Sequence, residues 1–158
     1  MDLTMKWQEI LSNPFFQNAP FKVELNKFGQ ILMSPASNWH GIFQFNVGNA
    51  IKEAKRSGVI IIECSILTSD GVRVADVAWA SNEFYAEFGG QTPYPKAPEI
   101  CVEVKSPANS KGEMDEKIRL YLAKGALEVW IVDENAKVNF YTHTGKLKKS
   151  KIAENFKL

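Results

Sequence analysis

Apolar and polar residues alternate along the chain with two different periods, and this pattern predicts a protein that contains both helices and strands. Apolar positions at helical spacing predict helices over residues 5–13, 37–58 and 109–125. Runs bounded by turn residues predict strands over residues 21–25, 30–34, 59–67, 72–80, 99–106, 127–133 and 137–143. Residues 82–98 are typical of an irregular connection with one helical turn. This order predicts an α/β (α+β) fold in which helices flank a mixed central β-sheet.

The composition is typical of one globular domain. The chain has 158 residues, of which 45% are hydrophobic and 23% charged, and this is enough to bury one core. We expect residues 1–158 to form a single domain, with 1–20 as an N-terminal helical extension and 143–158 as a basic tail. The lysines of that tail predict either a solvated, frayed terminus or a segment that contacts phosphate, and the first is favoured.

The sequence predicts a cytoplasmic protein. No apolar run approaches the roughly 18 residues of a membrane span, and the first residues lack the apolar stretch of a secretory signal. Cys64 and Cys101 are the only cysteines, and their strand-like surroundings favour free, buried thiols in a reducing compartment. The net charge of +1 gives no general support for nucleic-acid binding, but it does not exclude a local basic patch.

Two acidic residues interrupt strands that are otherwise mostly apolar. Asp76 lies in "VRVADVAWA", and Glu103 lies in "EICVEVKS", where it shares one face of the strand with Lys105. Burying an unpaired charge is costly, so these side chains must pair, meet water or hold an ion. If the two strands are neighbours in the sheet, the two acids can meet.

The Glu-x-Lys triplet by itself is weak evidence. The same spacing occurs at residues 53–55 and 115–117, but both of these lie in predicted helices, where residues two apart do not face each other. Only residues 103–105 place the acid and the lysine side by side on a strand. From this pattern alone, an ion pair at an edge strand and an active site remain equally good interpretations.

The functional interpretation has a definite chemistry. Two converging carboxylates form a site for a hard divalent cation, and Mg²⁺ prefers such oxygen ligands, as does Mn²⁺. We expect Asp76 and Glu103 to bind the metal, with the carbonyl of Val104 as a further ligand. The metal would activate water and neutralise charge on a phosphate, while Lys105 would orient the nucleophile or stabilise the transition state.

These residues resemble the PD-(D/E)XK nuclease superfamily, in which a strand Asp precedes a Glu-x-Lys strand. More closely, residues 21 to 142 are similar to the small single-domain family named "putative restriction endonuclease". The similar segments are "VELNKFGQILMSPASNWH", "VRVADVAW", "PEICVEVKSPANS" and "EKIRLYLAKGALEVWIVD". Ala75 stands where that family usually has proline, which a metal-binding carboxylate does not need. The resemblance implies a restriction-endonuclease-like fold.

The resemblance also implies further site residues. It brings His40 to the site, although a histidine that hydrogen-bonds at a helix start is an equally good interpretation. Lys117 and Tyr121 are four residues apart and share one helix face, which the resemblance puts near the site; a core-and-surface role is the favoured alternative. Gln44 and Ser106 are weaker candidates for contacting substrate.

The leading hypothesis is a Mg²⁺-dependent endonuclease that hydrolyses phosphodiester bonds in DNA and binds its phosphate backbone. Because cutting both strands of a duplex requires two active sites, we expect a homodimer. A nuclease fold kept as a catalytically silent binding or assembly module is an alternative from another class. Hydrolysis of RNA is a third possibility that these residues do not exclude.

Overall fold

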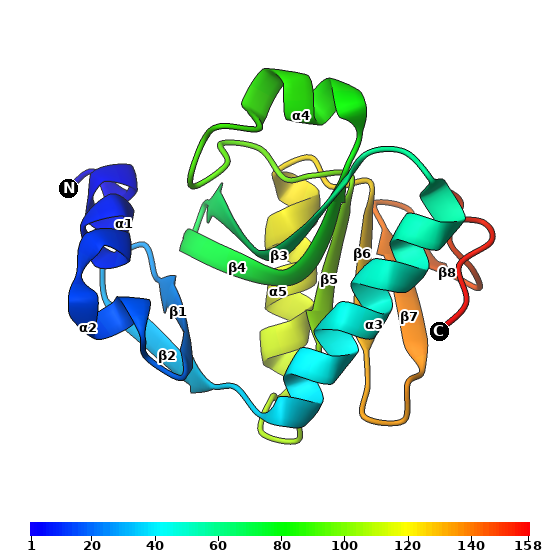
Figure 1. The fold of residues 1–158 in the computed structure, drawn as a ribbon, viewed down its shortest axis with the longest axis horizontal. Coiled ribbons are helices and arrows are strands. Elements are labelled where there is room, and N and C mark those ends of the chain that lie inside the picture. The colour runs from blue at the N-terminus through cyan, green and yellow to red at the C-terminus, as the bar shows by residue number, and fades with distance from the viewer.

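The computed structural model describes residues 1–158, which form five helices and eight strands (Figure 1). The helices are α1 (Leu3–Ser12), α2 (Pro14–Gln17), α3 (Asn38–Lys55), α4 (Asn82–Phe88) and α5 (Lys111–Ala123). The strands are β1 (Phe21–Leu25), β2 (Ile31–Pro35), β3 (Val59–Thr68), β4 (Gly71–Ala80), β5 (Ile100–Val104), β6 (Glu128–Val132), β7 (Val138–Thr142) and β8 (Gly145–Leu147). No helix has both the length and the apolar composition that a membrane crossing requires.

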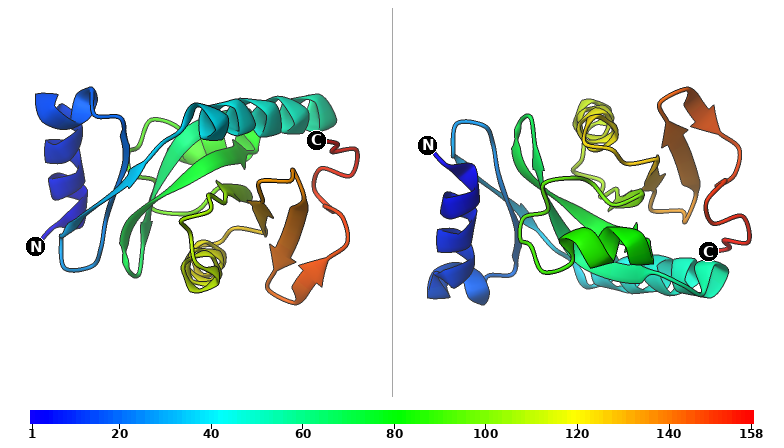
Figure 2. Two further views of the ribbon diagram at one scale, coloured as in Figure 1. Left: turned by 90° about the horizontal axis from the view of Figure 1, so that it is seen from below. Right: turned by 90° about the horizontal axis from the view of Figure 1, so that it is seen from above.

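The main sheet has six strands in the order β3-β4-β5-β6-β7-β8. β5 and β6 are parallel, and all other neighbours are antiparallel, so the predicted mixed sheet is confirmed. Figure 2 shows α3 and α5 on opposite faces of this sheet. The sequence missed only the short elements α2 and β8, and it placed Gly125 at the end of α5, where the structure has Lys124 as the cap and Gly125 just after it.

Successive side chains of β4 and β5 alternate between the two faces of the sheet, as the sequence predicts. Val77 and Val102 pack in the core under α3, whereas Ala78 and Cys101 pack in the core under α5. All residues of both strands are buried, because helices cover the sheet on both faces. An acidic side chain on either strand is therefore buried in the protein interior.

The N-terminal hairpin β1–β2 forms a separate small sheet that packs with α1 against β4 (Figure 1). Two polar contacts hold it there. The backbone N–H of Val74 donates to Glu24 Oε2 at 2.7 Å, and the Arg73 guanidinium donates to the carbonyl of Leu25 at 3.2 Å. Trp7 is buried in the small core between these elements. The hairpin thus fixes β1 beside the curved end of the main sheet.

The C-terminal segment is ordered, so the expectation of a frayed tail was wrong. β8 pairs with β7, Ala153 is buried, and the Phe156 ring lies 4.7 Å from that of Trp130. The reason is an apolar pattern between the lysines: Leu147, Ile152 and Phe156 pack on the core under α3. The five lysines themselves are exposed: Lys146, Lys148, Lys149, Lys151 and Lys157.

Glu128 anchors this segment, which leads to a stability prediction. Its buried carboxylate accepts hydrogen bonds from Ser150 Oγ at 2.7 Å, from the backbone N–H of Lys151 at 2.8 Å and from the indole of Trp130 at 2.8 Å. Glu128→Ala leaves these donors unpaired, so we expect the free energy of unfolding to fall by about 3 kcal/mol or more in urea titrations. The exposed Glu134→Ala is the control and should change it by less than about 0.5 kcal/mol. Equal, small effects would contradict this role.

Candidate active site

Asp76 and Glu103 meet at the end of the β4–β5 ladder. The paired residues are Trp79 with Ile100, Ala78 with Cys101 and Val77 with Val102, so the next step of this register places Asp76 opposite Glu103. Here the ladder stops, and Asp76 Oδ2 accepts a hydrogen bond from the backbone N–H of Val104 at 2.7 Å. Both acids are nearly inaccessible, with 1% and 2% of their surface exposed.

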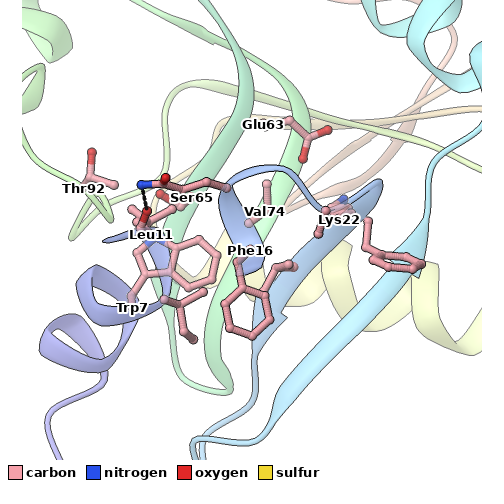
Figure 3. Close-up of a pocket in the computed structure, with 13 residues that line it drawn as sticks. Trp7, Leu11, Phe16, Lys22, Glu63, Ser65, Val74 and Thr92 are labelled. Carbon is pink, nitrogen blue, oxygen red and sulfur yellow. Dashed lines mark hydrogen bonds between the residues drawn. The ribbon is translucent and has the colours of Figure 1, made fainter. Parts of the chain in front are cut away.

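A lysine from the N-terminal hairpin lies between these two acids. Lys22 Nζ is 2.9 Å from Asp76 Oδ1 and 3.1 Å from Glu103 Oε2. Lys22 belongs to β1, which lies outside the main sheet (Figure 3). The two carboxylates therefore face one point, and a positive charge occupies it.

Two residues of α5 reach the same cluster. Lys117 Nζ lies 3.1 Å from Glu103 Oε1 and 3.2 Å from Glu24 Oε2, and the Tyr121 hydroxyl donates to Glu103 Oε1 at 2.7 Å. Because the two side chains are four residues apart, they leave the helix on the same face and converge on one carboxylate. The structure thus places both of these candidates against Glu103.

Two residues of α3 surround Asp76 from the other side. Ser37 caps the helix by accepting from the backbone N–H of His40 at 3.1 Å, and His40 Nε2 lies 3.3 Å from Asp76 Oδ2. Gln44, one turn further, donates to the backbone carbonyl of Asp76 at 3.2 Å and also contacts the carboxylate of Glu63. The other ring nitrogen of His40, Nδ1, is buried without a hydrogen-bond partner.

Lys105 lies apart from this cluster. It directly follows β5, and its backbone N–H donates to the carbonyl of Val132 at 2.8 Å. Its side chain lines neighbouring hollows beside Asp133 and makes no ion pair with either acid. Ser106 lines both the hollow at Lys105 and the one that holds the two acids, and its hydroxyl donates to Asn109 Oδ1 at 2.9 Å.

Sequence reasoning missed Lys22 and Glu24, which both contribute to the cluster. Their signal was present in "FKVEL", where an acid and a lysine two residues apart share one face of a predicted strand. This is the same pattern, in reverse order, that drew attention to Glu103 and Lys105. Nothing in the sequence, however, shows that the hairpin packs beside β4 and β5.

Burial and neighbouring charges set the protonation of this cluster. Burial raises the pKa of Asp76, but the charge of Lys22 and the interactions with His40 lower this pKa by more, so the carboxyl is ionised. Burial lowers the pKa of Lys22, but the charges of Glu103, Asp76 and Glu24 outweigh it and raise the pKa well above its usual value. The hydrogen bond to Asp76 raises the pKa of His40. Asp76 and Lys22 are therefore a charged pair at neutral pH.

Glu103 behaves differently and gives a pH prediction. Burial raises its pKa from 4.5 to about 7, although Lys117 and Lys22 act in the opposite direction. Between these values the folded protein holds a proton that the unfolded chain releases, so the contribution of Glu103 to stability falls as the pH rises through this window. We expect the free energy of unfolding of Glu103→Gln, measured in EDTA, to fall less steeply over the window than that of the wild type.

Glu63 and His40 supply the part of this slope that should remain in the variant. Burial raises the pKa of Glu63 above 4.5, and the hydrogen bond to Asp76 raises the pKa of His40 above 6.5, so both groups also make stability fall as the pH rises. Urea unfolding at several pH values measures both slopes. Identical slopes for Glu103→Gln and wild type would contradict the assignment of a raised pKa to Glu103.

The donor chemistry of the cluster suits a hard divalent cation, although side chains supply only two of the ligands. No group of three or more His, Cys, Asp or Glu side chains is arranged to hold a metal. Mg²⁺ commonly binds through one or two carboxylates and completes its octahedron with water and substrate phosphates. Asp76 and Glu103 point their oxygens at one cation position, so the residues fit Mg²⁺ or Mn²⁺ if the Lys22 ammonium moves aside.

Comparisons with known proteins agree with this fold. The structure is similar to the crystal structure of "a putative nuclease belonging to DUF820" from Anabaena variabilis ATCC 29413, with a TM-score of 0.72 and 17% identity over 96% of this chain and 93% of that chain. The two proteins thus share a mixed α/β fold. No curated protein matches the sequence.

The model of the Uma2 family, described as "Putative restriction endonuclease", matches residues 7–156. The chain therefore belongs to this family, and the family that the sequence predicted is confirmed.

Proposed function

We propose that the protein is a metal-dependent endonuclease that hydrolyses phosphodiester bonds in DNA. The observation that carries this proposal is the convergence of two buried carboxylates, Asp76 and Glu103, on one cation position at the end of a strand pair. Burying two acids side by side is costly in a structural core, and it is useful where a divalent cation must be held. Membership of a family of putative restriction endonucleases supports the same reaction class.

The residues have separable roles in this proposal. Asp76 and Glu103, with the Val104 carbonyl, would hold Mg²⁺ or Mn²⁺. The chemistry that the metal supplies when bound is neutralisation of phosphoryl charge and a lower pKa for water. His40 and Gln44 would hold the Asp76 side chain and backbone in place from α3. Both contacts exist without substrate, so Asp76 is held in position before a substrate binds.

The lysines would bind the phosphate. Lys22 and Lys117 already point their ammonium groups at the acids, so a phosphate placed there meets two positive charges that stabilise its developing negative charge. Tyr121 would orient Glu103 through its hydroxyl. Lys105 and Ser106, which line the adjoining hollow, would contact a flanking phosphate of the backbone.

A second function, that of a catalytically silent binding module, has one observation in its favour. Lys22 and Lys117 already neutralise the two acids, as expected for a structural ion-pair cluster. RNA remains an alternative substrate, because the phosphodiester chemistry is the same. A homodimer, needed for cutting both strands, is supported by β2, which pairs with β1 on one side only and exposes Leu32 and Met33.

Incubation with supercoiled plasmid and with single-stranded DNA tests the proposal. We expect cleavage in Mg²⁺ or Mn²⁺ and none in EDTA. Asp76→Asn should lower the rate by about 1,000-fold, because it removes a charged ligand and keeps the size of the side chain. Asp115→Asn, at an exposed position on α5, is the matched control and should cleave like the wild type.

Two outcomes would overturn the proposal. If Asp76→Asn and wild type cleave alike, Asp76 and Glu103 do not form the site of cleavage. If neither metal supports cleavage but the wild type binds DNA, the protein is better described as a catalytically silent binding module.

A further inference from the structure

A pocket of about 490 Å³ opens between α1, α2, β1 and the curved ends of β3 and β4 (Figure 3). Its walls are mainly apolar and aromatic, with contributions from Trp7, Leu11 and Phe16. Leu11 and Phe21 are exposed side chains at its edge, so a ligand can enter from solvent. The volume lies within the range of about 300–1,000 Å³ that is usual for small-molecule sites. None of the roles proposed above uses this space.

The pocket adjoins the acidic site through Lys22. This residue lines the pocket and also the hollow that contains Asp76 and Glu103. Glu63, another wall residue, lies in register with Asp76 on the neighbouring strand, because Ile62 pairs with Val77 and Cys64 with Ala75. A molecule that fills the pocket therefore ends beside the proposed metal position, with the Lys22 ammonium between the two spaces.

The backbone at Glu63 is strained in a way that favours a functional role. Its φ of 57° is left-handed, which is rare for a non-glycine residue inside a strand. The register pair with Asp76 is missing from the ladder at this point, and the Glu63 carboxylate instead contacts Gln44. This conformation places an acceptor group at the boundary between the pocket and the acidic site.

The polar groups of the pocket are few and include a donor with no partner. Gln17, Ser65 and Thr92 add hydrogen-bonding groups to the apolar walls. The indole N–H of Trp7 is buried and has no hydrogen-bond partner, which is unusual for a native structure and identifies a donor that a ligand acceptor could satisfy after a small shift of the wall. Aromatic faces with a few polar groups suit a flat heterocycle with hydrogen-bonding edges.

We propose that this pocket binds one unpaired nucleobase of the DNA strand whose backbone crosses Lys22. That the base neighbours the cleaved phosphate rests on the proposed nuclease function, whereas base binding itself does not. A base in a duplex has both faces stacked and its edge paired, so it cannot enter without leaving the helix. The protein accordingly prefers single-stranded or locally unpaired DNA over intact duplex.

Binding measured without catalysis tests the inference. The full-length protein in EDTA is titrated into two fluorescein-labelled strands of about 15 nucleotides, one of deoxythymidine and one with abasic sugars at its centre. Both strands carry the same phosphates, so fluorescence anisotropy isolates the contribution of the bases. We expect the wild type to bind the intact strand at least about fivefold more tightly, because stacking on an aromatic wall favours it.

Two variants that fill the pocket test whether the preference for the strand with intact bases depends on this pocket. Ala19→Trp places an indole among the lining residues, and Leu11→Trp does so from the exposed edge of α1, so that one variant remains if the other fails to fold. Both should bind the two strands equally. Phe15→Ala, which removes an aromatic ring that is 67% exposed and outside the lining, is the control and should keep the wild-type preference.

Each outcome has a separate meaning. Equal binding of both strands by wild type, or an unchanged preference in the filled variants, overturns the inference. Equal binding together with a dimer that the filled variants abolish assigns the pocket to a second copy of the chain and also overturns it. Base preference without any metal-dependent cleavage refutes the nuclease function and leaves the pocket assignment standing.

Discussion

Lys22→Met is expected to lower the rate of metal-dependent DNA cleavage by at least about 100-fold. Lys22 Nζ lies 2.9 Å from Asp76 and 3.1 Å from Glu103, so it is the ammonium group that contacts both acids of the proposed site. Removing one preorganised group that stabilises transition-state charge typically costs a factor of about 100 to 1,000. Methionine keeps most of the side-chain volume, which limits the effect on packing. Plasmid nicking under single-turnover conditions measures the change.

Lys105→Met is the matched comparison, because the sequence pattern assigned the catalytic lysine to this position. Lys105 makes no ion pair with Asp76 or Glu103 and lines the adjoining hollow, so we expect its loss to slow cleavage by no more than about tenfold. The reverse order of effects would return the catalytic role to Lys105 and would require it to swing toward the acids when substrate binds.

The same lysine should also control metal binding. In EDTA, Lys22→Met leaves two buried carboxylates without their shared counter-charge, and removing one partner of a buried ion pair costs about 3–5 kcal/mol. We expect its melting temperature to be at least about 6 °C below that of the wild type. Mg²⁺ should recover most of this loss, because the cation takes the position of the ammonium.

The wild type should gain less from Mg²⁺ than Lys22→Met does, because in the wild type the metal must first displace the ammonium. Asp76→Asn should gain nothing, and Lys111→Met, which removes an exposed charge at the start of α5, should match the wild type. Thermal melting over a series of Mg²⁺ concentrations measures these differences. An equal gain in Lys22→Met and wild type would show that the ammonium and the metal do not compete for one position.

The local pattern of apolar and polar residues was sufficient to predict most of the helices and strands. The alternation in β4 and β5 predicted which residues share a face of each strand, and the placement of Val77 with Val102 in one core and of Ala78 with Cys101 in the other confirms this. Helical spacing located α3 and α5 to within a few residues, and the structure has Ser37 and Ser110 as their N-caps. The ordered C-terminus was missed, because its apolar residues are sparse and become buried only against core residues such as Trp130 and Phe140.

For the candidate site, too, the sequence predicted some features and only the tertiary structure decided the others. The sequence by itself determined that Asp76 and Glu103 are anomalous strand acids and that Lys117 and Tyr121 leave one helix face together, because both statements depend only on the periods of strand and helix. Only the tertiary structure decided which lysine stands between the acids. The packing of a hairpin on β4 brings Lys22 across 54 residues of sequence to Asp76, whereas Lys105 follows the end of β5 and lines an adjoining hollow together with Asp133. Side-chain period is a local property, whereas the docking of one element on another depends on contacts between residues far apart in the chain.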